Sequence, residues 1–109
     1  MAELDTAKLL RSLGLCAKAG KMIYGVPMIC EALRRGGKTA PMLVLESSDT
    51  SENTHKKITD KCDYYKTRHV RLSCTSGELA AALGKTSSLA AVAVTDKNLC
   101  LAVEKYIGE

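Results

Sequence analysis

Hydrophobic residues recur along this chain with two different spacings. In five segments they return every three or four positions, the period of an amphipathic helix, and short apolar runs typical of strands separate these segments. The pattern predicts nine elements that alternate strictly between helix and strand, beginning and ending with a helix. This order favours one domain over residues 1–109, an α/β fold built as a three-layer α/β/α sandwich with a central mixed sheet of about four strands.

The ends of the predicted helices carry suitable residues. Asp5 is expected to be the N-cap of the first helix, and Gly20 is expected to end it. Gly25 opens the second helix, with Pro27 in its first turn, where a missing N–H does no harm. Thr75 and Glu78 have the spacing of a capping box at the start of the fourth helix.

Four apolar runs predict the strands, at residues 22–24, 41–45, 69–72 and 89–94. The runs at 41–45 and 89–94 are almost continuously hydrophobic, which indicates strands buried on both faces. The run at 69–72 is expected to be a further inner strand of the same sheet.

Composition adds that the core is aliphatic. Hydrophobic residues make up 46% of the chain, and Trp and Phe are absent. The five cysteines contain no C-x-x-C pair, and a zinc site would need closer ligands, so they are interpreted as reduced thiols of a cytoplasmic protein. With Glu3 and Asp5 and no long apolar run, the first residues resemble neither a signal peptide nor a membrane anchor.

No arrangement of residues predicts catalysis. His55 lies on a lysine-rich helix and His69 begins a strand, and neither has a serine or cysteine partner at a motif spacing, so both are interpreted as surface or edge residues. The tripeptide that starts at Gly84 resembles the end of a P-loop, but the upstream glycine is missing. We therefore expect a non-enzymatic protein with no cofactor, metal site or small-molecule substrate.

Two edges of the predicted fold suit an anionic partner, in keeping with a formal net charge of +4. The first is the start of the second helix, where backbone N–H groups and the helix dipole favour phosphate. Lys21 precedes this helix, and Arg34, Arg35 and Lys38 lie at its far end. The second edge is the polar loop at residues 84–88, which carries Lys85 and three hydroxyl groups.

Several segments together resemble the ribosomal protein 7Ae/30e superfamily, and most closely its small bacterial YlxQ-type members. They include LGLCAKAGK at residues 13–21, Gly25 with ALRRG at 32–36, and SENTHKKITDKC at 51–62. ELAAALGK at 78–85 and VAVTD at 92–96 complete the pattern, which runs from about residue 9 to residue 107.

The resemblance implies a cytoplasmic protein that binds kink-turn RNA. In that family a helix N-terminus enters the major groove at tandem sheared G·A pairs, and a loop after the fourth helix covers the displaced bases. These elements correspond to Gly25 onward and to residues 85–91. The RNA-binding candidates are then Lys21, Gly25, Val26, Pro27, Met28, Glu31, Arg34, Arg35, Lys38, Lys85, Ser87, Ser88 and Leu89. The expected partner is structured RNA, with ribosomal RNA or the ribosome as candidates, bound by a monomer away from any membrane.

The chain departs from the family at the positions that read bases. Pro27, Met28 and Glu31 stand where the family has Asn, Glu and Lys. Hydrogen bonds to base edges contribute about 1–3 kcal/mol of discrimination for each good pair. Pro27 and Met28 offer no comparable donor or acceptor, and Glu31 would repel phosphate. The base-reading roles therefore do not carry over, whereas the close backbone approach at Gly25 does.

Two other classes of function remain open from the sequence. One is a protein-interaction module that has lost RNA reading, with an apolar patch formed by Met22, Tyr24, Pro27, Met28 and Ile29. The other is an enzyme that uses a reactive cysteine, which would require a thiol in an environment that lowers its pKa.

Overall fold

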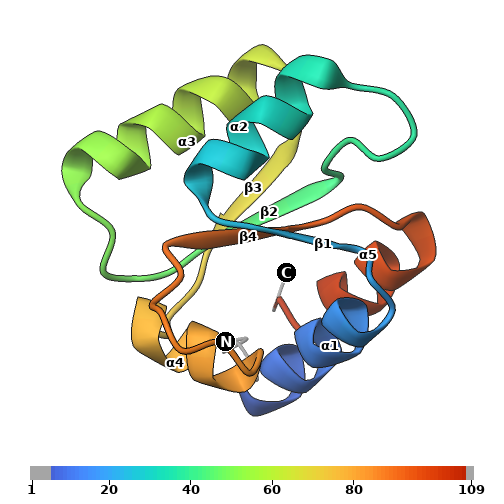
Figure 1. The fold of residues 1–109 in the computed structure, drawn as a ribbon, viewed down its shortest axis with the longest axis vertical. Helices are drawn as coiled ribbons and strands as arrows, with labels where there is room; N and C mark the ends of the chain where they lie inside the picture. The colour runs from blue at the N-terminus through green and yellow to red at the C-terminus, as the bar shows by residue number, and fades with distance from the viewer. Residues whose placement is uncertain (1–5, 108–109) are drawn as a thin grey trace.

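The computed structural model describes residues 6–107, and all nine elements occur in the predicted order (Figure 1). The predicted N-cap at Asp5 lies outside the described residues. The helices are α1 (Thr6–Lys18), α2 (Val26–Arg35), α3 (Glu52–Tyr64), α4 (Ser76–Ala82) and α5 (Lys97–Glu104). The strands are β1 (Met22–Tyr24), β2 (Leu43–Glu46), β3 (Arg68–Arg71) and β4 (Ala91–Val94).

The four strands form one mixed sheet in the order β1-β4-β2-β3. Strands β2 and β3 are parallel, whereas β4 runs antiparallel to both of its neighbours, β1 and β2. The prediction of an inner strand at 69–72 is wrong, because β3 lies at the edge of the sheet. Its burial pattern agrees: Arg68 and Arg71 are exposed and the two residues between them are only half-buried.

This topology brings the ends of three strands together. Because β1, β2 and β3 run in the same direction, their carboxyl ends meet the start of β4 at one end of the sheet. The N–H of Gly25 donates to the carbonyl of Ala91 at 2.9 Å, and the N–H of Ser47 donates to the carbonyl of Ala90 at 2.8 Å. We call this the Gly25 end of the sheet. Lys21 lies at the other end, where its carbonyl accepts from the N–H of Thr95.

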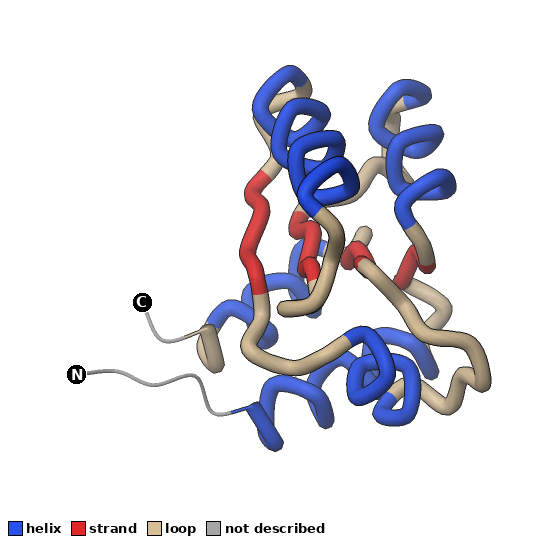
Figure 2. The backbone as a smooth tube through the Cα atoms, turned by 90° about the vertical axis from the view of Figure 1, so that its left-hand side faces the viewer, coloured by secondary structure: helices blue, strands red, loops and turns tan. Residues whose placement is uncertain are grey.

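Helices cover both faces of the sheet (Figures 1 and 2). Helices α2 and α3 lie on one face, and α1, α4 and α5 lie on the other, so the predicted three-layer sandwich is confirmed. Alternate residues of β2 divide between the two cores: Leu43 and Leu45 pack with α1, α4 and α5, whereas Val44 packs with α2 and α3. Each of these side chains is fully buried, a gain of about 1.5–3 kcal/mol relative to exposure.

All five cysteines are free thiols. Cys16, Cys62, Cys74 and Cys100 are buried, and Cys30 is half-buried. Burial raises the pKa of the Cys62 thiol to about 11, and burial likewise raises the pKa of the three other buried thiols. A raised pKa keeps a thiol protonated and unreactive at neutral pH, so these four cysteines lack the environment that a nucleophilic cysteine needs.

Within residues 6–107 the helices are all too short or too polar to cross a bilayer.

Candidate functional site

The start of α2 is built by backbone geometry. Gly25 is the N-cap, with φ 87° and ψ 148°, a conformation that side chains disfavour but that glycine adopts readily. Within the described residues no side chain caps this helix by a hydrogen bond. Helix geometry leaves the N–H groups of Val26 and Met28 without an acceptor inside the helix, and Pro27 has none to satisfy. The result is a pair of N–H donors, on half-buried Val26 and exposed Met28, at the positive end of the dipole.

The loop between α4 and β4 lies beside this helix start. Gly84 ends α4 with φ 72°, and the N–H of Leu89 donates to the carbonyl of Ser76 at 3.1 Å. The Nζ atom of Lys85 lies 4.2 Å from the centroid of the Tyr24 ring, one residue before Gly25. The two edges that the sequence indicated are thus adjacent. Ser87 and Ser88 are exposed, whereas Leu89 packs against the core.

A groove of about 880 Å³ extends from this point between α1 and α4. Its apolar floor includes Leu10, Leu83 and part of the Tyr24 ring, and Arg11, Lys18 and Lys85 contribute the cations of its lining. Arg11 and Lys18 are exposed residues of α1 that the sequence did not indicate as candidates. Their proximity to Lys85 depends on how α1 packs against α4, and no local sequence signal reveals it.

The other predicted cations lie at the opposite end of α2. This helix is ten residues long, or about 15 Å, and it carries Arg34 and Arg35 to the Lys21 end of the sheet. Arg35 lines a small groove there together with Gly20 and Thr95. The predicted residues therefore form two groups. One surrounds Gly25 and Lys85, and the other contains Lys21, Arg34, Arg35 and Lys38.

Glu31 lies between the two groups and pairs with the second. Its carboxylate accepts from Arg34 Nη2 at 2.7 Å and lies 3.7 Å from Arg35 Nη2. The Arg34 hydrogen bond and charge hold the pKa of the Glu31 carboxyl below its usual value. Both arginines remain exposed, but this carboxylate offsets part of their positive charge.

The apolar patch considered for protein contacts is smaller than predicted. Pro27 is exposed and Met28 is 57% exposed, but Ile29 is 1% exposed and belongs to the core between α2, α3 and the sheet. Met22 and Tyr24 are half-buried. Only two consecutive residues of α2 therefore present an open apolar surface.

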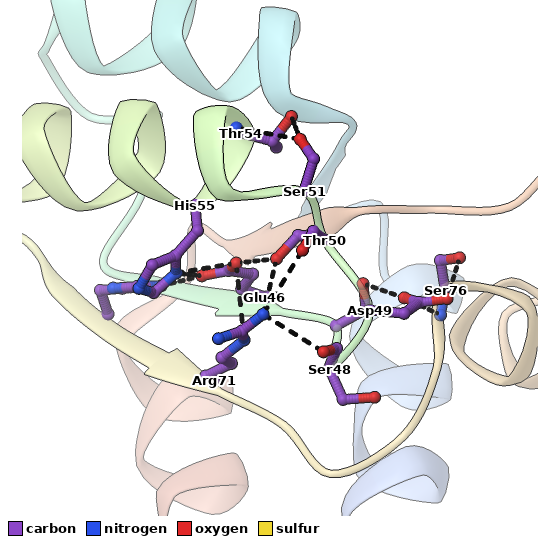
Figure 3. A network of polar contacts seen from close by, with 11 residues as sticks. Glu46, Ser48, Asp49, Thr50, Ser51, Thr54, His55, Arg71 and Ser76 are labelled. Atoms are coloured by element: carbon purple, nitrogen blue, oxygen red, sulfur yellow. Dashed lines mark hydrogen bonds and ion pairs between the residues drawn. The ribbon is translucent and has the colours of Figure 1, made fainter.

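His55 lies partly exposed on α3 and His69 lies in the edge strand β3, in agreement with the interpretation from the sequence, but the two side chains share a buried partner. Both contact Glu46, the last residue of β2, which is fully buried. Figure 3 shows His55 beside the Glu46 carboxylate. His55 Nδ1 lies 2.8 Å from Glu46 Oε1, and His69 Nε2 lies 2.8 Å from the same oxygen. The predicted strand ended at residue 45, so the burial of a glutamate at its end was missed.

Other groups complete the surroundings of Glu46. The Thr50 hydroxyl donates to Oε2, and Arg71 Nε lies 3.8 Å from that oxygen. Burial alone would raise the pKa of the Glu46 carboxyl, but the hydrogen bonds from Thr50, His55 and His69 outweigh burial and lower it. The carboxylate is therefore ionised at neutral pH. It accepts the hydrogen bonds from Thr50, His55 and His69 and forms an ion pair with Arg71.

Comparison with protein families identifies the relatives of this chain. The model of the ribosomal protein L7Ae/L30e/S12e/Gadd45 family matches residues 7–103. The chain belongs to this family. It is 36% identical over 85 residues to the RNA-binding protein YlxQ of Bacillus subtilis, an alignment that covers 78% of this chain and 80% of that protein. The YlxQ protein of Enterococcus faecium is 32% identical over 85 residues and has similar coverage, 78% and 79%.

Solved structures of similar proteins share the fold. A Bacillus halodurans protein of unknown function superposes with a TM-score of 0.82 and 30% identity, covering 93% of this chain and 97% of that one. The 15.5 kD RNA-binding protein of Giardia lamblia gives a TM-score of 0.74 at 14% identity, over 94% and 83% of the two chains. Membership of the L7Ae family, expected from the residues quoted above, is thus confirmed.

Proposed function

We propose that this protein is a non-catalytic, ribosome-associated RNA-binding protein of the cytoplasm that recognises kink-turn-like RNA as a monomer. The observation that carries the proposal is the joining of two elements at the Gly25 end of the sheet. The uncapped N-terminus of α2 lies beside the Lys85 loop, and a hydrogen bond from Gly25 to Ala91 fixes their relative position.

The chemistry of this surface suits an RNA backbone. Two free N–H groups at a helix N-terminus bind a phosphate oxygen well, and glycine at the N-cap lets the backbone approach closely. Lys85 adds a charge on the neighbouring loop, and Arg11 and Lys18 extend the positive surface along the α1–α4 groove. The YlxQ relatives, which share this family, are named as RNA-binding proteins.

Recognition would then depend on shape and backbone more than on base edges. Pro27 and Met28 occupy the tip of α2, where their side chains offer no strong hydrogen-bonding groups. Met28 is exposed enough to pack against an unstacked base, and the backbone N–H groups beside it hold the phosphate. A kink-turn suits this mode because it presents a widened groove of fixed shape.

A binding titration with paired RNAs tests the proposal. The first RNA contains a kink-turn, and the second is the same sequence with its tandem G·A pairs replaced by Watson–Crick pairs. We expect tighter binding to the first, and log affinity should fall with log salt by about 0.7–0.9 for each phosphate contact. Equal affinity for both RNAs would reject kink-turn specificity, and no salt-sensitive binding to either would reject the function.

A matched pair of variants locates the surface. Lys85→Gln removes a charge from the proposed interface and should reduce the salt dependence by about one contact. Lys105→Gln removes an equivalent exposed charge after α5, next to Glu104 and its ion pair with Arg68. The second variant should bind as the wild type does. If both variants lose affinity equally, the binding is general electrostatic attraction rather than contact at the proposed surface.

Association with the ribosome requires a separate test. Crosslinking in cells followed by sequencing of the bound RNA should recover ribosomal RNA at a small number of positions. Recovery of unrelated transcripts alone would contradict this part of the proposal while leaving RNA binding intact.

The exposed pair Pro27 and Met28 supports a second candidate function, a protein-interaction module. Met28 borders a small groove of about 240 Å³ that also includes Met22 and Ala32. A photo-crosslinking amino acid at position 28 distinguishes the candidates. Crosslinks to one protein that survive nuclease treatment would favour protein contact, and crosslinks to RNA would favour the first proposal.

A further inference from the structure

The cluster of Glu46, His55 and His69 gathers three potential metal ligands from three different elements. Glu46 ends β2, His55 lies in the second turn of α3, and His69 lies in the edge strand β3. One nitrogen of each imidazole and a carboxylate oxygen all lie within 4.8 Å of one another. Glu46 Oε1 is the common point, since it lies 2.8 Å from His55 Nδ1 and 2.8 Å from His69 Nε2.

Burial is graded across the cluster. The Glu46 side chain is completely buried, the His69 side chain is 15% exposed, and the His55 side chain is 39% exposed. The carboxylate thus forms the floor of the cluster, and the His55 side opens to solvent. An ion can enter from that side and keep water as a further ligand, as metal sites with three protein ligands do.

The surroundings fix the carboxylate in place. Its Oε2 oxygen accepts from the Thr50 hydroxyl, and Arg71 Nε lies 3.8 Å away. Arg71 is itself anchored, because its Nη2 donates to the Ser48 carbonyl at 3.2 Å. Such outer contacts orient the ligating groups of metal sites and hold them ready for the ion. The Arg71 charge would repel a bound cation. Arg71, however, faces Glu46 Oε2, the oxygen that also accepts from Thr50, and not Oε1.

The donor set indicates which ions fit. Two imidazole nitrogens and one carboxylate oxygen suit zinc and its neighbours in the first transition series. Calcium and magnesium prefer oxygen ligands, of which this cluster supplies too few. None of the three residues belongs to the surface proposed to contact RNA, so the cluster needs a separate explanation.

We propose that Glu46, His55 and His69 form a binding site for one divalent transition-metal ion of the zinc class. Without the ion, each imidazole donates an N–H to the ionised carboxylate. On binding, the ring nitrogen of each histidine that faces Glu46 gives up its proton to solvent water and ligates the ion. The imidazole ligand then carries one proton, exchanged with the same solvent, on its other ring nitrogen. The bound ion would join β3, one of the two edge strands of the sheet, to β2 and α3, and would stabilise that edge.

The test begins with untagged protein freed of metal by a chelator and kept under reducing conditions. Calorimetric titration with Zn²⁺ should give one ion per chain. Imidazole NMR signals of both histidines should shift together as the ion is added. Titration with Co²⁺ should give visible absorption bands without the near-ultraviolet thiolate band, which would indicate ligation by the cysteines.

Two variants and a control then assign the ligands. His55→Gln and His69→Gln retain an amide donor for Glu46, so the fold should survive, and each should weaken metal binding by about tenfold or more. Glu104→Gln removes a carboxylate that pairs with Arg68 on the same edge strand, and its metal binding should match the wild type. A thermal melt of each variant confirms folding before the titration.

Three outcomes would overturn the proposal. The first is a folded wild-type protein that takes up no stoichiometric Zn²⁺ or Co²⁺. The second is binding that persists unchanged in the His55→Gln/His69→Gln double variant. The third is a cobalt spectrum dominated by thiolate bands, which would place the ion at the cysteines. The imidazole NMR shifts are measured on the wild-type protein. They therefore test the site even if a histidine variant fails to fold.

Discussion

The ammonium group of Lys85 lies 4.2 Å from the centroid of the Tyr24 ring. This contact connects the loop after α4 to the last residue of β1, two segments about sixty positions apart in the chain. It holds the Lys85 loop against the start of α2, and it lies at one end of the groove between α1 and α4. One prediction of RNA binding depends directly on this contact.

Tyr24→Leu should weaken binding to a kink-turn RNA by about twofold to fivefold. The substitution keeps an apolar side chain in β1 but removes the ring face, and an exposed cation–π contact contributes about 0.5–1 kcal/mol. Fluorescence anisotropy at fixed salt measures the change. Tyr24→Phe keeps the ring and should bind as the wild type does, so a loss in both variants would mean that the hydroxyl, rather than the ring face, matters.

Glu31→Gln should strengthen RNA binding and make it more sensitive to salt. The substitution removes the carboxylate that now neutralises part of the charge of Arg34 and Arg35. If the freed arginines contact phosphate, the salt slope should steepen by about one contact, 0.7–0.9. Glu104→Gln is the matched control, because it frees Arg68 from a 2.7 Å ion pair outside the proposed surface. An equal effect of both substitutions would remove Arg34 and Arg35 from the interface.

Thr75→Ala should lower the free energy of unfolding by about 0.5–2 kcal/mol. The Thr75 hydroxyl accepts from the N–H of Glu78, and the Glu78 carboxylate accepts from the N–H of Thr75, so the capping box of α4 is complete. Urea denaturation with an unchanged slope would give the value. Thr75→Ser keeps the hydroxyl and should retain most of the stability. If Thr75→Ala leaves the free energy of unfolding unchanged, packing alone stabilises α4.

Asp49→Asn should destabilise the protein at neutral pH but not in acid. The N–H of Ser76 donates to Asp49 at 2.9 Å, and with the hydroxyls of Ser47 and Ser76 it lowers the pKa of the Asp49 carboxyl. Because the pKa of the Asp49 carboxyl is lower in the folded state, the ionised carboxylate stabilises the fold at pH values above its pKa in the unfolded chain, about 3.9. This stabilisation is lost as the pH falls through the pKa of the folded state. Melting temperatures of both proteins from pH 7 to pH 2 should converge in acid. A constant difference over that range would contradict the assignment.

Thiol labelling at neutral pH should modify one cysteine before the others. Cys30 is half-buried, whereas the other four are buried and have raised pKa values. We expect a fast phase of one equivalent, followed by labelling as slow as transient unfolding allows. Cys30→Ser should abolish the fast phase. Rapid labelling of any buried cysteine would reopen the possibility of a nucleophilic thiol.

Local sequence signals predicted the elements of this fold well because their causes are local. The capping box at Thr75 and the helix entry at Gly25 depend on residues a few positions apart, and both are confirmed. The almost continuous apolar runs likewise identified β2 and β4 as strands that are buried on both faces. The order of strands in the sheet is a tertiary property, and the prediction that residues 69–72 form an inner strand was therefore wrong.

The candidate site likewise has parts that the sequence predicted and parts that depend on tertiary packing. The sequence predicted the Gly25 helix start and the Lys85 loop, and the family resemblance joined them. It left Arg11 and Lys18 outside the set of candidates, because only the packing of α1 against α4 brings them near Lys85. It listed Arg34 and Arg35 with no indication that Glu31 offsets their charge, although a spacing of three and four residues on a helix favours such pairs.

The amino-acid sequence was sufficient to predict the helices, the strands, the helix starts at Gly25 and Thr75, and the family, since each of these depends on short-range patterns or on residues compared one by one. The tertiary structure decided that Glu46 is buried and that His55 and His69 both face it. These residues are nine and 23 positions from Glu46. They meet because β3 pairs in parallel with β2 and because α3, which connects the two strands, packs over the same edge of the sheet. No local sequence pattern specifies that these three elements come together.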